Sequence, residues 1–121
     1  MKSRLAAPAV SDITHILDWS RESFGFAARA RYERLIARGL RAIAAPTPPT
    51  ASRPAGDAAP GVQLFHLRHV RRESDGSLPV GRPRHVLAYR IIASDLVIVL
   101  RVLHDAMDLP AHLVEDGDPY D

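Results

Sequence analysis

The sequence contains no cysteine among its 121 residues, which excludes disulfide bonds, thiolate metal sites and cysteine nucleophiles. It also lacks any apolar run near the roughly 20 residues that a membrane-spanning helix needs. The first residues, Met1 to Pro8, include no apolar stretch long enough for a secretory signal peptide. We therefore expect a cytoplasmic protein.

Lysine is almost absent as well, because Lys2 is the only lysine and the other fifteen basic residues are arginines. Residues 1–104 carry an excess of eight positive charges, whereas residues 105–121 carry six acidic groups and no basic one, which leaves a net charge of +2. A basic body can attract nucleic acid or an acidic protein partner. The alternative interpretation is a compositional preference for arginine, which suits carboxylate and phosphate pairing equally well.

A chain of this length can bury one real core but not two. Apolar side chains at helical spacing predict one helix from about Pro8 to Phe24 and a second from about Ala27 to Ala45. Gly25 between them suits a helix C-cap, and so short a break predicts an αα-hairpin. Trp19 lies at the edge of the first apolar stripe and is expected to pack. The solvated face of the second helix is expected to carry Arg29, Arg31, Arg34, Arg38 and Arg41.

The stretch Ala45–Gly61 is rich in proline, so it cannot form a regular helix or an inner strand and is predicted to be a surface connection. Three strands are expected after it, at Val62–Arg71, Arg84–Ile92 and Leu96–Leu103. Asp75-Gly76 is the strongest turn signal between the first two. The three strands would form an antiparallel meander.

The segment Leu96–Leu103 is the most β-prone and apolar of the chain, and only Arg101 interrupts it. Its apolar side chains fall on both parities, which predicts an inner strand covered on both faces. An arginine there must find a partner, because an unpaired buried charge is costly. Asp105 and Asp108 are the nearest acidic candidates. The alternative is that Arg101 contacts a target or a protein partner directly.

With a short N-terminal edge strand at Lys2–Ala6, these elements predict an α+β fold in the order βααβββ. An αα-hairpin would pack on a small antiparallel β-sheet, and a short C-terminal helix from Pro110 to Leu113 would follow. A single domain is expected over residues 1–113, with an acidic, frayed tail at 114–121. Met107 and Leu113 are expected to cap the core.

This order of elements, with Arg101-Val102-Leu103-His104 followed after two residues by Met107-Asp108, resembles the RelE/ParE superfamily of bacterial type II toxins, and its ParE branch in particular. Trp19-Ser20, Phe24-Gly25 and the segment Arg84–Arg90 also match. The residues that the resemblance marks as structural parts of the family motif are Tyr89, Arg101, His104, Met107, Asp108 and His112.

The two branches of the superfamily imply different functions. RelE-like members cut messenger RNA on the ribosome with a cluster of arginine, lysine and tyrosine. In that RelE-like branch an arginine occupies the position that aligns with Val86 here. Further basic residues follow the last strand in that branch, where this chain has Asp105, Ala106 and Asp108. ParE-like members instead bind DNA gyrase and trap it on cleaved DNA. The resemblance therefore implies a non-enzymatic toxin without catalytic residues or cofactor, neutralised by a ParD-like antitoxin whose C-terminal segment wraps the toxin across its helices and sheet.

Two alternatives stay open at this point. The chain could be a RelE-like ribosome-dependent messenger endoribonuclease, or a non-toxic relic that only binds its antitoxin. No membrane partner and no direct sequence-specific nucleic-acid binding are expected.

The densest basic group flanks the Asp75-Gly76 turn. It is either a solvated hairpin or a surface for an acidic antitoxin or for the gyrase–DNA complex. His104 has the pKa range of a proton carrier, but a structural role is expected, because no nucleophile accompanies it. A metal site is not expected, since cysteine is absent and His66 and His69 would lie on opposite faces of a strand. The candidate contact residues are Arg68, Arg71, Arg72, Arg82, Arg84 and Arg101.

Overall fold

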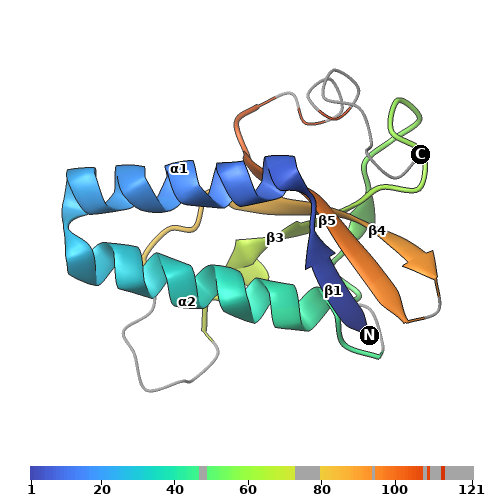
Figure 1. The fold of residues 1–121 in the computed structure, drawn as a ribbon, viewed down its shortest axis with the longest axis horizontal. Helices are drawn as coiled ribbons and strands as arrows, with labels where there is room; N and C mark the ends of the chain where they lie inside the picture. Colours follow the sequence, from blue (N-terminus) through green and yellow to red (C-terminus); the bar gives the residue numbers. More distant parts are fainter. Residues whose placement is uncertain (47–48, 73–79, 94, 108, 110–112, 114–121) are drawn as a thin grey trace.

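The first strand of the chain lies beside the last one. A computed structural model describes residues 1–46, 49–72, 80–93, 95–107, 109 and 113. Its five strands form one mixed sheet in the order β1-β5-β4-β3-β2, in which β1 runs parallel to β5 and the other pairs are antiparallel (Figure 1). The strands are β1 (Lys2–Leu5), β2 (Arg53–Pro54), β3 (Gln63–His66), β4 (His85–Ala93) and β5 (Leu96–His104).

The sheet confirms the N-terminal edge strand and the inner position of β5, and it corrects two other predictions. The proline-rich connection contributes a further strand, β2, at the second edge of the sheet, where Pro54 is tolerated because an edge needs no N–H on its outer side. The predicted strand Val62–Arg71 ends early, at His66, and continues as the 3-10 helix η1 (Leu67–Val70). The His66 ring accepts the N–H of Arg68 at 3.0 Å and caps this turn.

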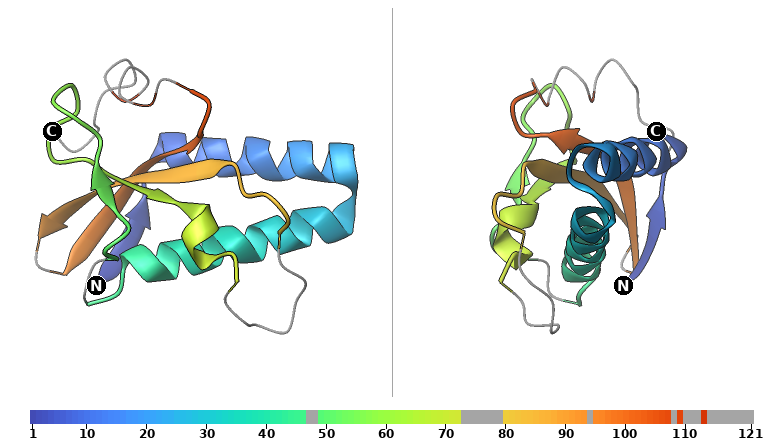
Figure 2. Two further views of the ribbon diagram at one scale, coloured as in Figure 1. Left: turned by 180° about the vertical axis from the view of Figure 1, so that it is seen from behind. Right: turned by 90° about the vertical axis from the view of Figure 1, so that its left-hand side faces the viewer.

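The two helices, α1 (Ala7–Phe24) and α2 (Phe26–Ile43), form the predicted hairpin and cover one face of the sheet (Figures 1 and 2). Pro8 lies in the first turn of α1, where its missing N–H costs no helical hydrogen bond. Gly25 ends α1 with φ of 93°, and its N–H donates to the Arg21 carbonyl at 2.8 Å. A side chain at this backbone conformation would be strained, which explains the glycine.

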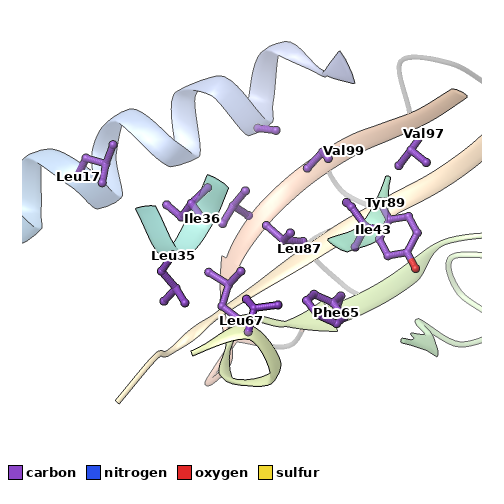
Figure 3. Close-up of a cluster of buried hydrophobic side chains, with 13 residues drawn as sticks. Leu17, Leu35, Ile36, Ile43, Phe65, Leu67, Leu87, Tyr89, Val97 and Val99 are labelled. Atoms are coloured by element: carbon purple, nitrogen blue, oxygen red, sulfur yellow. The ribbon is translucent and has the colours of Figure 1, made fainter. Parts of the chain in front are cut away.

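Both faces of β5 are buried, as the sequence predicts. On the helix side, Leu35 and Ile36 of α2 pack with Leu87, Val97 and Val99 of the inner strands (Figure 3). On the opposite face, small residues of the proline-rich connection and the end of the chain cover the sheet. The members of that second cluster that lie outside β4 and β5 are Ala6, Ala55, Ala59, Val62, Leu64, Leu109 and Leu113.

Helix α2 approaches the sheet most closely at Gly39. A Cβ atom at this position would lie 2.5 Å from Leu67 Cδ2 and 3.1 Å from Leu87 Cδ1. Both leucines are fully buried. The absence of a side chain at Gly39 therefore sets how near the helix lies to η1 and β4.

Arg101 pairs with Asp12 of α1, a partner that the sequence did not predict. Its Nε donates to Asp12 Oδ2 at 2.7 Å and its Nη2 donates to Oδ1 at 3.0 Å. The same carboxylate accepts the N–H of Val102 at 2.9 Å. The hairpin brings α1 over β5, so this partner comes from 89 positions away. Asp105, one of the two expected partners, pairs with His66 and Arg84 instead, and the other, Asp108, lies outside the described residues.

Three more side chains differ from expectation. Arg38 is buried, with 4 % of its surface exposed, and its Nε donates to the Val70 carbonyl at 3.1 Å, so it is not on the solvated face. Trp19 and Met107 are 58 % and 44 % exposed and do not pack into the core, whereas Leu113 is buried as predicted. Several expectations lie outside the described residues, namely the Asp75-Gly76 turn, Asp108, Pro110, His112 and the tail at 114–121.

Candidate binding pocket

A pocket of about 540 Å³ opens between the hairpin and the segment that leads into β4. Side chains from α1, from α2, from residues 80–84 and from the facing ends of β4 and β5 line it. Its volume lies within the range of roughly 300–1,000 Å³ that small-ligand sites occupy. The tip of the hairpin extends past the sheet (Figure 1).

One wall of the pocket is aromatic. Trp19 and Phe24 of α1 contact each other edge to face, with ring centroids 5.4 Å apart. They are 58 % and 68 % exposed, and Phe26 beyond them is 75 % exposed. Large apolar side chains gathered at an opening are typical of an interaction surface rather than of a solvated one.

The charge of the pocket is positive. Arg31 of α2 and Arg82 and Arg84 of the segment before β4 line it, and no aspartate or glutamate does so among the described residues. Arg84 Nη2 lies 3.0 Å from Asp105 Oδ1 and is partly neutralised. Within the described part of the chain, Arg31 and Arg82 have no carboxylate partner. These two guanidinium groups are therefore available to an anion.

Tyr32 and His85 fix each other's protons. The Tyr32 oxygen accepts the backbone N–H of Arg84 at 3.2 Å and lies 2.6 Å from His85 Nδ1. With the tyrosine O–H donating to Nδ1, the neutral imidazole carries its proton on Nε2. Burial, with His104 nearby, lowers the pKa of His85 to about 4. Burial also raises the pKa of Tyr32, so both groups are neutral near pH 7.

His104 lies beside this pair, with its ring centroid 5.4 Å from that of His85. Its Nδ1 accepts the N–H of Ala106 at 3.1 Å and so holds the turn after β5. In its neutral form this ring also carries the proton on Nε2. Both imidazoles line the pocket, and neither Nε2 has an acceptor among the described residues.

Asp105 is held behind the pocket by two basic partners. His66 Nε2 lies 2.8 Å from Asp105 Oδ2, and Arg84 Nη2 lies 3.0 Å from Oδ1. Burial alone would raise the pKa of Asp105, but the hydrogen bond from His66 and the charge of Arg84 outweigh it, and the pKa falls below its usual value. The carboxylate is therefore ionised at neutral pH.

The candidate contact residues fall into four groups. Arg82 and Arg84 line the pocket, whereas Arg68 and Arg72 are exposed on or next to η1. Arg71 donates from Nε to the Val80 carbonyl and ties η1 to the segment before β4. Arg101 is engaged with Asp12 and belongs to the scaffold.

Tyr89, a residue of the predicted family motif, is 1 % exposed. Its hydroxyl lies 2.6 Å from Ser52 Oγ of the proline-rich connection, so it anchors that connection and does not reach the pocket.

Sequence reasoning missed the pairing of Tyr32 with His85 and the pocket they help to form. The two residues are 53 positions apart, and no local pattern links them. The sequence indicated the exposure of Trp19 only weakly, through its position at the edge of the apolar stripe of α1. Among the described residues, no three histidine or acidic side chains are placed to hold a metal ion, and none of the described helices is long and apolar enough to span a membrane.

A comparison with protein families gives one match. The model of the family described as "ParE toxin of type II toxin-antitoxin system, parDE" matches residues 4–109. This range contains both helices, the four strands β2 to β5 and every residue that lines the pocket. No curated protein matches the chain.

Proposed function

The chain belongs to the ParE toxin family of type II toxin–antitoxin systems, and we propose that it acts in the cytoplasm by binding DNA gyrase and stopping replication, without an enzymatic step. The observation that carries this proposal is the family match over nearly the whole chain. Membership also implies an antitoxin partner. We propose that this partner is of the ParD type.

The end of β5 supports binding over RNA cleavage. A ribonuclease of the related branch needs basic groups after this strand to offset the charge on the transferring phosphate. Here Asp105 follows β5 directly, and its lowered pKa keeps it ionised. It also engages Arg84 and His66. The strand therefore ends in a paired carboxylate rather than in free basic groups. This arrangement favours a toxin that acts by binding its target over one that cleaves RNA.

A supercoiling assay tests the target. Purified toxin added to gyrase, relaxed plasmid and ATP is expected to stop supercoiling and to leave linear DNA after denaturation, because the trapped enzyme holds a broken duplex. Toxin premixed with its antitoxin is the matched control and should restore supercoiling. Unchanged supercoiling at a large excess of toxin over gyrase would rule out gyrase as the target.

The antitoxin surface is proposed to include the basic group around η1. Arg68 and Arg72 are exposed there, and an acidic partner segment would be attracted to them. The product of the neighbouring reading frame, added to Arg68→Ala/Arg72→Ala toxin, is expected to bind at least about fivefold more weakly than to the parent toxin. Arg53→Ala, which removes an exposed arginine from the edge strand β2 outside η1, is the control and should bind normally. Equal losses in both variants would argue against this surface.

A second candidate function is ribosome-dependent cleavage of messenger RNA, and one observation favours it. The fold brings Tyr32, His85 and His104 into a single pocket with arginines, a combination that can move protons next to a phosphate. Primer extension on translated messages would show new ends in phase with codons if this were the activity. Intact messages, with gyrase stalled in the parallel assay, would remove it.

A further inference from the structure

The pocket combines three properties that point to a specific ligand chemistry. Its mouth is aromatic, formed by Trp19 and Phe24. Its flanks carry Arg31 on α2 and Arg82 on the segment before β4, both without a carboxylate partner in the described part of the chain. It is also lined by the imidazole rings of His85 and His104, whose Nε2 atoms have no partner among the described residues.

We propose that this pocket binds one nucleotide unit of a single-stranded nucleic acid, with the base against Trp19 and Phe24 and the neighbouring phosphates on Arg31 and Arg82. Stacking on exposed aromatic rings and a positive groove for the backbone are the two elements by which proteins hold single strands without reading their sequence. The inference goes beyond the proposed toxin activity and stands whether or not gyrase is the target.

The interior donors favour a base over an apolar peptide side chain. His85 and His104 each have Nδ1 occupied as an acceptor, by the Tyr32 hydroxyl and by the Ala106 N–H. Each Nε2–H therefore needs an acceptor when the pocket is filled. A leucine or phenylalanine would bury both donors unpaired, which is costly. The carbonyl oxygens and ring nitrogens of a base would satisfy them.

The charge pattern favours a nucleic-acid backbone as well. Planar guanidinium groups match phosphate geometry, and Arg31 and Arg82 come from different elements, so they can hold successive phosphates. Asp105 does not oppose this arrangement, since it is not among the residues that line the pocket and its charge is offset by Arg84. Binding is expected to be independent of sequence and to involve no cleavage.

Trp19 provides a direct readout, because it is the only tryptophan of the chain and it lines the pocket. Full-length toxin, freed of antitoxin, is titrated at low salt with two probes, an oligothymidylate of eight nucleotides and an oligouridylate of the same length. We expect saturable quenching of the tryptophan fluorescence by at least one of them. Quenching by the DNA probe, the RNA probe or both supports the pocket and identifies the sugar that it accepts.

Matched variants locate the site. Arg31→Ala and Arg82→Ala are each expected to weaken binding roughly tenfold and to lower the slope of log affinity against log salt by about one. Arg41→Ala removes the same charge from an exposed position of α2 outside the pocket and should bind within about twofold of the parent. Phe24→Leu should weaken binding roughly fivefold or more by loss of stacking. Thermal melts establish that each variant is folded.

Several outcomes would overturn the proposal. One is the absence of quenching by either probe at a large excess. Another is an equal loss of affinity in Arg41→Ala and Arg82→Ala, which would show diffuse attraction to a basic body. A third is saturable quenching by an acidic, leucine-containing peptide but by neither oligonucleotide, which would assign the pocket to a protein segment. None of these results depends on the supercoiling assay, so the two proposals can fail separately.

Discussion

At the scale of single residues, backbone N–H groups order the hydrogen bonds of the pocket. The Arg84 N–H donates to the Tyr32 hydroxyl, which pairs with His85, and the Ala106 N–H donates to His104. Burial lowers the pKa of His85 to about 4, so this ring is neutral and a poor proton carrier near pH 7. The pocket is therefore better suited to holding a ligand than to acid–base chemistry.

The lowered pKa of His85 predicts that the protein loses stability on mild acidification. The unfolded chain takes up a proton near pH 6.5, whereas the folded protein resists protonation until about pH 4. Stability is then complete above pH 6.5 and declines as the pH falls from 6.5 towards 4. We expect the free energy of unfolding to drop by about 2 kcal/mol between pH 7 and pH 5 from this group.

Urea unfolding at the two pH values measures this effect. His85→Asn places an amide oxygen near the position of Nδ1, where it can accept the Tyr32 hydroxyl, but cannot titrate, so it should lose most of the pH dependence. A variant with the same pH dependence as the parent would place the titrating group elsewhere.

The ion pair of Arg101 with Asp12 is a second prediction at this scale. Arg101→Ala would leave the largely buried Asp12 carboxylate with the Val102 N–H as its described partner on β5, and we expect a loss of about 2 kcal/mol of unfolding free energy. Asp12→Ala/Arg101→Ala should cost less than the two single changes together. Additive losses in this double-mutant cycle would mean that the pair is not coupled.

At the scale of elements, the sequence predicted the helices and strands in which apolar residues recur at a regular spacing. The helices, β4 and β5 follow from their apolar patterns, and the hairpin break follows from Gly25. The 3-10 helix η1 was missed because Val62 to Val70 alternates like a strand, and the cap that ends β3 is a side-chain bond from His66. Strand β2 was missed because it has only two residues, Arg53 and Pro54, which is too few to show an alternation of apolar and polar side chains.

The side-chain partners were less predictable than the elements. Arg101 was assigned to acidic residues near it in sequence, but the packing of α1 on β5 provides Asp12 as a partner. Arg38 was placed on the solvated face because its neighbours in the helical pattern are also arginines, and η1 supplies the carbonyl that makes its burial tolerable. Such contacts depend on how helices and strands pack against one another. The spacing of apolar residues within one element does not indicate which other element it meets.

The close approach of α2 to the sheet gives a prediction at this scale. Gly39→Ala should lower the free energy of unfolding by about 1–2 kcal/mol, because overpacking against Leu67 and Leu87 outweighs the better helix propensity of alanine. Gly81→Ala is the matched control, since a Cβ there meets nothing within 4 Å, and should change stability by less than about 0.5 kcal/mol. Chemical denaturation of both variants checks this, and equal stabilities would show that the helix can shift without cost.

At the scale of the whole molecule, the excess of eight positive charges over residues 1–104 predicts how the toxin meets its antitoxin. Attraction between a basic toxin and an acidic partner speeds encounter and is screened by salt. We expect the association rate constant to fall about tenfold or more between 50 mM and 500 mM salt, with a much smaller change in the dissociation rate. Stopped-flow mixing measures both, and a salt-independent association rate would contradict the electrostatic account.

The parallel pairing of β1 with β5 also constrains the order in which the fold can assemble. Lys2 to Leu5 find their hydrogen-bonding partners at Leu96 to Val99, on the far side of both helices and three other strands along the chain. Contacts so distant along the chain form late. The αα-hairpin can form from local contacts, but the sheet cannot close on β1 until β5 has been made. A chain cut short before β5 would therefore expose an edge of β4 and lack His104, one of the residues that line the pocket.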